Sequence, residues 1–295
     1  MKRTKNKDTP SAILTADWHL REDTPVCRTD DFQTEQWKKV QEIARMQTAF
    51  GCPVFHAGDL FNHWKPSPWL LSKTMQHLPE QFWTVYGNHD LPQHNLELAN
   101  KCGVYALATA RWVNLLTTCH WNHTPDTYSW RFYKDRKMLV WHVMNYQGRK
   151  PWPGCTDPSS AKLLRKYPHY DLILTGHNHK PFVEEYEGRL LVNPGSITRQ
   201  EAKQADHRPR VYLYYAEEHR VESVELNYNE GVISREHISN IEERDNRIDA
   251  FISKLDTDWE AEMSFEDNLH KFFSKNKTSN AVQEIITKSL DNDNS

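Results

Sequence analysis

Five short motifs of acidic, amide and imidazole side chains occur in the first two thirds of the chain. In order they are Asp17-Trp18-His19, Gly58-Asp59, Gly87-Asn88-His89-Asp90, the single His142 and Gly176-His177-Asn178-His179. A donor set that mixes aspartate, asparagine and histidine suits borderline divalent cations such as manganese, iron or zinc, whereas a cage of oxygens alone suits magnesium or calcium. The motifs therefore predict a site for divalent metals.

Each motif lies at the end of a short apolar run that reads as a buried β-strand. The runs span residues 11–17, 53–59, 82–88, 137–142 and 171–177. Because strand ends converge on one edge of an α/β sheet, side chains far apart in the sequence can meet there in one crevice. A single strand-end aspartate usually caps a helix, and a lone histidine usually packs in a core. Five fragments in this order favour the metal site over those structural explanations.

A glycine precedes the polar residue in three of the motifs. Gly58, Gly87 and Gly176 stand where a strand must turn sharply into a loop and bring its backbone close to the metals. Glycine permits both because it has no Cβ.

Helical patterns separate these strands and predict an α/β layered fold. Residues 34–50 follow the cap signal of Asp30 and Asp31, and residues 67–78 include Pro68 at the helix start. Further on, residues 182–192 turn at Gly188, and residues 210–217 and 220–226 read as paired strands.

The pattern becomes helical from residue 231. One stripe of a long polar helix carries Ile238, Ile241, Ile248, Ile252 and Leu255. Two shorter helices are expected at residues 265–273 and 279–290. We therefore expect a first domain over residues 1–230 and a short helical extension over residues 231–295.

The composition excludes several classes of protein. Of the 295 residues, 38% are hydrophobic, which is enough for a packed core. No apolar run has the length of a membrane helix, and the five cysteines form no CxxC pair, which argues against a disulfide framework and a thiolate zinc site. The first eight residues and the segment after them lack the apolar core of a signal peptide, so we expect a cytoplasmic protein.

In this order, the five motifs resemble the DxH, GD, GNHD, H and GHxH blocks of the calcineurin-like metallophosphoesterase family. The resemblance covers about residues 11–200. It implies a four-layer α/β/β/α sandwich that holds two divalent metals at one rim, with manganese expected and iron, zinc or magnesium as alternatives. By the likeness, one metal is held by Asp17, His19, Asp59 and His179, and the other by Asp59, Asn88, His142 and His177.

The same resemblance implies a mechanism without a protein nucleophile. Two cations about 3.5–4 Å apart lower the pKa of a shared water and clamp both oxygens of an in-line displacement, so an activated hydroxide attacks the phosphate. His89 resembles the family's histidine that contacts the phosphate and helps to protonate the leaving oxygen. Asp90 is expected to orient His89 by accepting a hydrogen bond.

Two fragments point to one branch of the family. Gly58-Asp59-Leu60-Phe61 followed by Lys65-Pro66-Ser67-Pro68 resembles a segment of DNA-repair nucleases of the SbcD type, and Asn193-Pro194-Gly195-Ser196 resembles their PGS turn. The likeness implies a DNA exonuclease or endonuclease acting in repair or recombination. Asn62 departs from the pattern, because archaeal and eukaryotic members carry a histidine there, and asparagine can donate a hydrogen bond but not a proton.

Several cations and aromatic rings near the predicted rim are candidate DNA contacts. Aromatic rings interleaved with cations can stack bases and neutralise phosphates, although many of the eleven tryptophans must simply pack. The candidates are Asn62, Arg149, Lys150 and Arg199, together with Trp18, Trp64, Tyr146 and Trp152.

The C-terminal helices have two interpretations. They either dock on their own domain or, by resemblance to SbcD-like subunits, grip the coiled coil of an SMC-type ATPase of the SbcC kind. Homodimerisation is a further expected association, and no membrane contact is expected.

Two other functions compete with the nuclease. The compact size suits a small-molecule phosphodiesterase or phosphatase of the same fold. A catalytically silent metal-binding scaffold is the third hypothesis, and the complete set of ligand positions argues against it.

Overall fold

The computed structural model describes residues 9–116, 130–133, 136–239, 243–249 and 265–292. The chain divides into two compact units, Met1–Ser234 and Arg235–Ser295. The boundary expected at residue 230 lies just before this division. The first unit carries both β-sheets and all five motifs.

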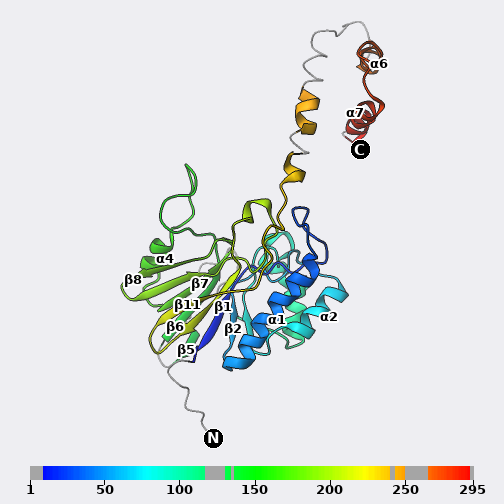
Figure 1. Ribbon diagram of the computed structural model, residues 1–295. Helices are drawn as coiled ribbons and strands as arrows, with labels where there is room; N and C mark the ends of the chain where they lie inside the picture. Colours follow the sequence, from blue (N-terminus) through cyan, green and yellow to red (C-terminus); the bar gives the residue numbers. More distant parts are fainter. Residues whose placement is uncertain (1–8, 117–129, 134–135, 240–242, 250–264, 293–295) are drawn as a thin grey trace. The chain divides into compact units, whose positions relative to one another are not determined.

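The first sheet has six strands in the order β11-β10-β1-β2-β3-β4 (Figure 1). Strands β1 to β4 are parallel, whereas β10 runs antiparallel to both β1 and β11. Their bounds are β1 (Ala12–Thr15), β2 (Val54–His56), β3 (Phe82–Thr84), β4 (Asn114–Leu115), β10 (Arg210–Tyr215) and β11 (Arg220–Glu225). The parallel strands β1, β2 and β3 therefore end at one edge, each just before a motif.

The second sheet has five strands in the order β5-β6-β7-β9-β8. Strands β6, β7 and β9 are parallel, and β5 and β8 each pair antiparallel with a neighbour. The bounds are β5 (Trp130–Tyr133), β6 (Arg136–His142), β7 (Leu172–Gly176), β8 (Phe182–Tyr186) and β9 (Arg189–Asn193). His142 is the last residue of β6, and the Gly176–His179 motif begins at the last residue of β7.

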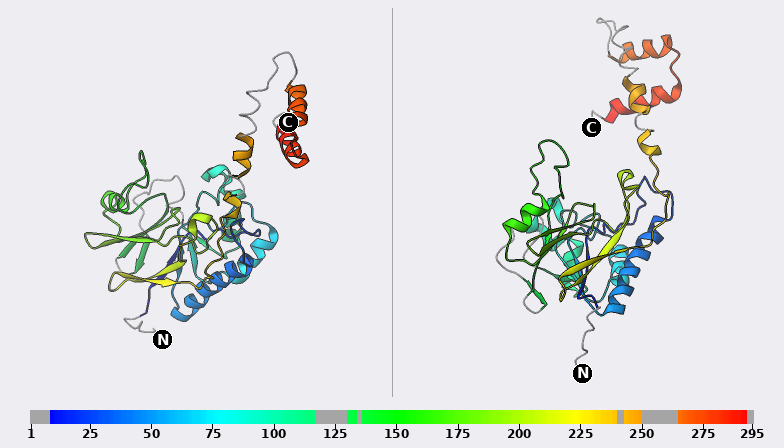
Figure 2. Two further views of the ribbon diagram at one scale, coloured as in Figure 1. Left: turned by 45° about the horizontal axis from the view of Figure 1, so that its top comes forward. Right: turned by 60° about the vertical axis from the view of Figure 1, so that its left-hand side comes forward.

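Helices cover the outer face of each sheet. They are α1 (Phe32–Phe50), α2 (Pro68–His77), α3 (Gly103–Thr109) and α4 (Ser160–Lys166), with short 3-10 turns η1 (Pro92–His94), η2 (Leu96–Lys101) and η3 (Ala202–Gln204). The views in Figure 2 show α1 and α4 on opposite sides of the pair of sheets. The predicted layered α/β fold is confirmed.

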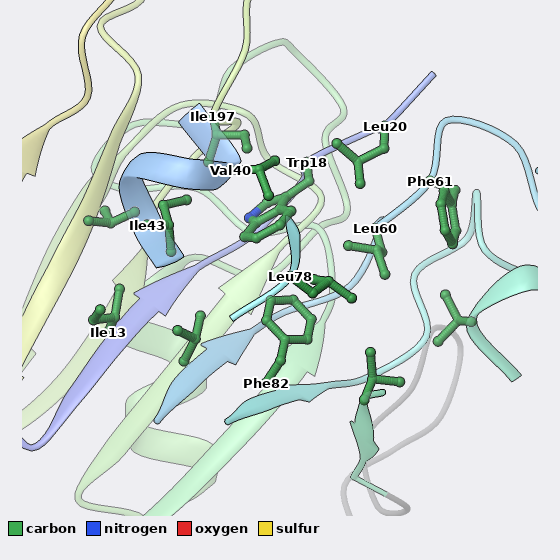
Figure 3. Packing of buried hydrophobic residues seen from close by; sticks show 14 of the residues in the cluster. Ile13, Trp18, Leu20, Val40, Ile43, Leu60, Phe61, Leu78, Phe82 and Ile197 are labelled. Atoms are coloured by element: carbon green, nitrogen blue, oxygen red, sulfur yellow. The ribbon is translucent and has the colours of Figure 1, made fainter. Parts of the chain in front are cut away.

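Three hydrophobic clusters fill the spaces between these layers. Because strand side chains alternate between faces, Ile13 of β1 packs with Val40 and Ile43 of α1, while Leu14 points to the other face (Figure 3). Leu14 packs with residues of the second sheet such as Leu174. The third cluster joins α4 to the outer face of β6, β7 and β9. Each layer is therefore joined to the next by buried apolar contacts.

Side-chain caps, a glycine and a proline explain where α1 and α2 begin or end. Asp31 caps α1 by accepting a hydrogen bond from the Thr34 backbone N–H at 3.1 Å, and Gly51 ends it with a left-handed φ of 61°. Ser67 caps α2, and Pro68 occupies its first turn as expected. The hairpins predicted around Gly188 and between residues 210 and 226 are also present, as β8–β9 and β10–β11.

The second unit contains α6 (Phe265–Lys275) and α7 (Asn280–Asn292), close to the predicted ranges. Leu269, Phe272 and Phe273 of α6 form a small cluster with Ile286 of α7. Two stretches of the expected long helix, residues 236–239 and 243–249, are helical, and they contain Ile238 and Ile248 of the isoleucine stripe. The other stripe residues, Ile241, Ile252 and Leu255, lie outside the described residues. No helix among the residues described is long and apolar enough to cross a membrane.

Candidate metal centre

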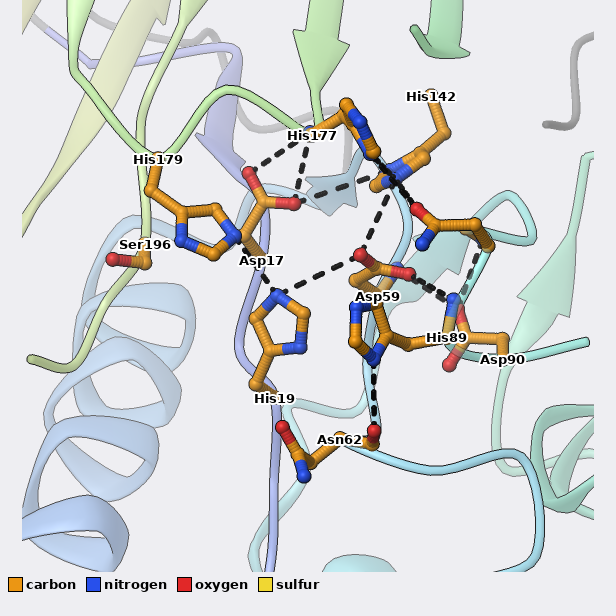
Figure 4. Close-up of polar contacts among 12 residues, drawn as sticks. Asp17, His19, Asp59, Asn62, His89, Asp90, His142, His177, His179 and Ser196 are labelled. Carbon is orange, nitrogen blue, oxygen red and sulfur yellow. Dashed lines mark hydrogen bonds and ion pairs between the residues drawn. The ribbon is translucent and has the colours of Figure 1, made fainter. Parts of the chain in front are cut away.

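The strand ends bring all seven predicted ligands to one place (Figure 4). Three groups have donor atoms that lie within 4.8 Å of one another. The groups are Asp17 with His19 and His179, Asp59 with His142 and His177, and His19 with Asp59 and His89. Since His19 and Asp59 each belong to two groups, the geometry forms one continuous centre rather than separate clusters.

In the first half of the centre, His19 and His179 face each other. Their Nε2 atoms lie 3.1 Å apart. Asp17 stands beside them and accepts a hydrogen bond from the His177 backbone N–H at 2.9 Å. His19 and Asp17 are almost fully buried, so this half is largely shielded from solvent.

In the second half, three donors converge on one point. The Asn88 Oδ1 atom lies 3.0 Å from His142 Nε2 and 2.8 Å from His177 Nδ1. The carboxylate of Asp59 lies between the two halves, with Oδ2 at 3.3 Å from His142 Nε2 and 3.6 Å from His19 Nε2. This is the placement that a bridging carboxylate requires.

The donor chemistry fits divalent cations. His142 donates its Nδ1–H to the Ala57 carbonyl at 2.7 Å, which directs Nε2 into the centre, where a bound cation would take the place of its proton. His19 Nδ1 is buried and has no hydrogen-bond partner within the described chain. Imidazole nitrogens that face one another, with a carboxylate and an amide oxygen between them, are the donor set expected of a borderline metal.

Of the ten non-glycine residues with positive φ in the described part of the chain, four are predicted metal ligands. Asp17, His19, Asp59 and His177 all have positive φ, at 51°, 46°, 58° and 77°. A non-glycine residue in this region costs roughly 1–2 kcal/mol. Strain of this kind persists where the surrounding structure enforces it, commonly at functional sites. The four strained ligands therefore argue for a function beyond folding.

The three motif glycines make room for this geometry, as predicted. A Cβ built on Gly87 would lie 2.1 Å from Asp59 Oδ1, and one on Gly176 would lie 2.4 Å from the Ala57 carbonyl oxygen. Gly58 also has a φ of +89°, and its Cβ would lie 2.6 Å from His142 Nδ1. Any larger residue at these positions would displace the ligands or their supports.

Burial and close charges shift the acid–base properties of the centre. Burial raises the pKa of Asp17 to about 6, although His179 and His142 oppose the rise. Burial also disfavours the charge on Asp59, but His142 holds the pKa of this carboxyl well below its ordinary value. Conversely, burial opposes a charge on His142, yet Asp59 raises its pKa to about 9. The Asp59–His142 pair thus favours opposite charges at the middle of the centre.

His89 stands at the mouth of the centre. Its ring is exposed and lies 4.8 Å from the His19 ring, and its backbone N–H donates to Asp59 Oδ1 at 2.8 Å. The Nδ1–H donates to the Asn62 carbonyl oxygen at 2.9 Å. A backbone carbonyl therefore orients the ring through Nδ1, and Nε2 is the ring nitrogen that this hydrogen bond does not use.

The role expected for Asp90 is wrong. Asp90 is fully buried, and its carboxylate accepts four backbone N–H groups rather than a hydrogen bond from His89. Oδ2 accepts from Asp59 at 2.8 Å, from Gly87 at 3.0 Å and from Leu60 at 3.3 Å, and Oδ1 accepts from Phe61 at 3.1 Å. Through these hydrogen bonds Asp90, in the loop after β3, holds the loop after β2 in place.

The candidate substrate residues separate into two groups. Asn62 is half-buried beside His89, and Arg149 and Lys150 are exposed in the loop after β6. Arg199 is only 3% exposed, because its guanidinium donates to the carbonyl oxygens of Ala205 and Asn229 and lies 4.8 Å from the Tyr228 ring centroid. The prediction that Arg199 binds phosphate is therefore wrong.

Trp18 is also a structural residue. Its side chain is fully buried and donates to Thr15 Oγ1 at 2.8 Å. Trp18 lies in the loop after β1 and packs in the apolar cluster beneath α1, with residues such as Val40. Trp152, by contrast, is 48% exposed.

The sequence analysis did not identify two glutamines, Gln200 and Gln204, that contact the ligands His19 and His179. Gln200 donates through Nε2 to the His19 carbonyl oxygen at 3.0 Å, and Gln204 Nε2 lies 3.4 Å from His179 Nδ1. Both follow the Asn193–Ser196 turn closely in the sequence. Their position after that turn is the only sequence signal that they carry.

The chain was compared with known proteins. A family model described as the calcineurin-like phosphoesterase superfamily domain matches residues 13–216. No curated protein matched the chain.

Among solved structures, an archaeal phosphodiesterase is similar at a TM-score of 0.42 and 15% identity, over 73% of this chain and 99% of that one. A metallophosphoesterase from Sphaerobacter thermophilus has a TM-score of 0.37 and 14% identity, over 74% and 89%. Vps29 from Entamoeba histolytica has a TM-score of 0.36 and 15% identity, over 73% and 99%.

Proposed function

This chain belongs to the calcineurin-like phosphoesterase superfamily and is a metal-dependent hydrolase of the metallophosphoesterase type, and we propose that it cleaves the phosphodiester bonds of DNA. The observation that carries the hydrolytic chemistry is the convergence of Asp59 and six other donor side chains (Figure 4). The choice of DNA rests on the sequence Gly58-Asp59-Leu60-Phe61 and Lys65-Pro66-Ser67-Pro68, which resembles nucleases of repair and recombination.

The family binds two divalent metals, and the donor set described above would hold them. When bound, such cations supply Lewis acidity toward the phosphate and lower the pKa of an attacking water. We propose manganese by resemblance to the SbcD-type nucleases, and the mixed set of four histidines, two aspartates and one asparagine fits borderline divalent cations in general. Iron, zinc and magnesium are the alternatives that metal analysis would distinguish.

The residues of the chain have separate tasks in this proposal. Asp59 joins the two halves of the centre, and His142 and Asn88 complete the second half. His89 contacts the phosphate through Nε2, and in its protonated form donates a proton to the leaving oxygen. The Asn62 carbonyl fixes His89 by accepting its Nδ1–H, so the substituted asparagine contributes through its backbone.

Arg149 and Lys150 are proposed to bind the DNA backbone. Both are exposed in the loop after β6, the strand whose last residue is His142. Cations placed near a phosphodiesterase centre neutralise phosphates and give binding that weakens with salt. Replacing both by alanine should raise KM for DNA and reduce its salt dependence, without changing kcat for a small diester.

The proposal is tested with end-labelled single- and double-stranded DNA in the presence of manganese. Wild type is compared with Asp59→Ala and His89→Ala, and the exposed Asp206→Asn serves as the control. Metal-dependent cleavage that both active-centre substitutions abolish supports the nuclease. Intact DNA with hydrolysis of a small bis-ester would instead identify a small-molecule phosphodiesterase.

We also propose that the helical unit from residue 235 onward binds an SMC-type ATPase, by resemblance to SbcD-like subunits. The proposal rests on that resemblance alone, because Leu269, Phe272 and Phe273 of α6 are buried within the unit against Ile286 of α7. Co-purification with and without residues 235–295 tests this. Unchanged association after the deletion would contradict it, and sedimentation of the purified chain would test the proposed homodimer.

A further inference from the structure

His179 is contacted from both sides of its ring. Nε2 faces His19 Nε2 at 3.1 Å, in the metal centre. On the opposite side, Nδ1 lies 3.4 Å from Gln204 Nε2 and 4.0 Å from Glu201 Oε1. An amide donor and a carboxylate acceptor therefore stand next to the same ring nitrogen.

The orientation of the Gln204 amide is fixed by its own contacts. Its Oε1 accepts the backbone N–H groups of Gln200 at 2.6 Å and Glu201 at 3.0 Å. Its Nε2 donates to Ser196 Oγ at 3.1 Å. Because a flipped amide would place N–H groups against two backbone donors, the Nε2 end must face His179.

This orientation has a consequence for the His179 proton. A donor facing Nδ1 favours the tautomer that carries its hydrogen on Nε2. A histidine that binds a metal through Nε2 must instead carry the hydrogen on Nδ1, where an acceptor normally holds it. Gln204 cannot be that acceptor, since its oxygen is already committed to two backbone groups.

Glu201 is placed to accept this hydrogen. Its Oε2 lies 2.5 Å from Lys203 Nζ, and its Oε1 is directed to His179. The separation of 4.0 Å requires only a small movement of a side chain that is 43% exposed. A carboxylate beside a metal-binding imidazole fixes the ring and strengthens its donor atom.

We propose that Glu201 is a positioning residue of the metal centre, which accepts the Nδ1–H of His179 when Nε2 binds a divalent cation. Gln204 holds the ring in the competing tautomer, so the two residues set the metal affinity of this half of the centre. The inference rests on the metal site of the proposed function, but not on DNA as the substrate.

The test is calorimetric titration of the metal-stripped full-length chain with manganese. Glu201→Leu should weaken one of the two sites by about 10–100-fold, and Glu201→Gln, which keeps a neutral acceptor, should weaken it less. Glu185→Leu, at an exposed position of β8, is the matched control and should bind as wild type. Urea unfolding of each variant reports whether the fold is kept.

Nitrogen NMR of the histidines provides a second measurement that a merely structural role would not change. In the wild type titrated with zinc, His179 should come to carry its hydrogen on Nδ1, and Glu201→Leu should raise the zinc concentration at which that signature appears. Wild-type affinity in folded Glu201→Leu would overturn the proposal. Failure of the wild type to bind metal would overturn both this and the proposed function, whereas intact metal binding without DNA cleavage would contradict the nuclease alone.

Discussion

Replacing Asp90 by asparagine changes one atom of the group that joins two loops of the metal centre. The carboxylate accepts four backbone N–H groups, three on Oδ2 and one on Oδ1. An asparagine that keeps its oxygen at the Oδ2 position places an NH2 group against the Phe61 N–H. That donor is buried, and it loses its only acceptor in the loop.

The expected cost follows from these four bonds. A buried donor left without a partner costs about 1–3 kcal/mol. Each of the three remaining bonds changes from a charged to a neutral acceptor, a difference of about 1 kcal/mol. Asparagine also removes a charge that burial and Asp59 disfavour, and this relief offsets the loss of about 3 kcal/mol at the three remaining bonds, so the net cost is about 1–3 kcal/mol. Since burial and Asp59 raise the pKa of Asp90 to about 7, the comparison belongs at pH 8, where the carboxylate is ionised.

Urea denaturation at pH 8 measures this prediction. Asp90→Asn should lower the free energy of unfolding by about 1–3 kcal/mol, whereas Asp206→Asn at an exposed position should change it by less than about 0.5 kcal/mol. Manganese affinity should fall as well, because the displaced loop carries Asp59. A folded Asp90→Asn protein within 1 kcal/mol of wild type would refute the reasoning that this carboxylate fastens the two loops.

Three further predictions concern other parts of the first unit. Gly87→Ala should destroy metal binding in calorimetry, because its Cβ would lie 2.1 Å from Asp59 Oδ1, and wild-type affinity would contradict the close fit. Arg199→Met should lower the free energy of unfolding in urea by about 2–4 kcal/mol, since it removes two hydrogen bonds from a charged, buried guanidinium to the Ala205 and Asn229 carbonyl oxygens, but should leave KM for DNA within twofold of wild type. Burial lowers the pKa of His56 from 6.5 to about 3, so below pH 6.5 the unfolded chain binds a proton that the folded chain does not, and stability falls as the pH falls. Between pH 7 and pH 4 this loss amounts to about 3 kcal/mol, and His56→Gln should lack it in paired urea titrations.

The positions of the metal-centre residues could be predicted because they depend on local patterns. His142 is the last residue of β6, and Asp59 lies three residues after the end of β2, as the alternation of apolar runs and polar ends indicated. Parallel pairing brings such ends together within each sheet, and the packing of the two sheets on each other brings Asp59 to His142. Whether these residues bind metal stays a prediction that the geometry supports.

The roles of Asp90 and Arg199 could not be predicted in the same way. Asp90 stands next to His89 in the sequence, yet its partners are backbone groups of another loop. Arg199 follows a turn near the rim, but the segment that returns after β11 brings Tyr228 and Asn229 around its guanidinium. Contacts between distant segments decide both roles, and neither leaves a periodic signal.

Hydrolysis of bis(p-nitrophenyl) phosphate by the full-length chain tests most directly whether the metal centre around Asp59 carries the hydrolytic activity. The chain is stripped with a chelator, reloaded with manganese while the bound metal is counted, and compared with Asp59→Asn treated identically. The account predicts that turnover disappears on stripping, returns when two metals are bound, and stays absent in Asp59→Asn. Turnover that survives stripping, or a wild-type chain that binds two metals and hydrolyses nothing, would contradict it.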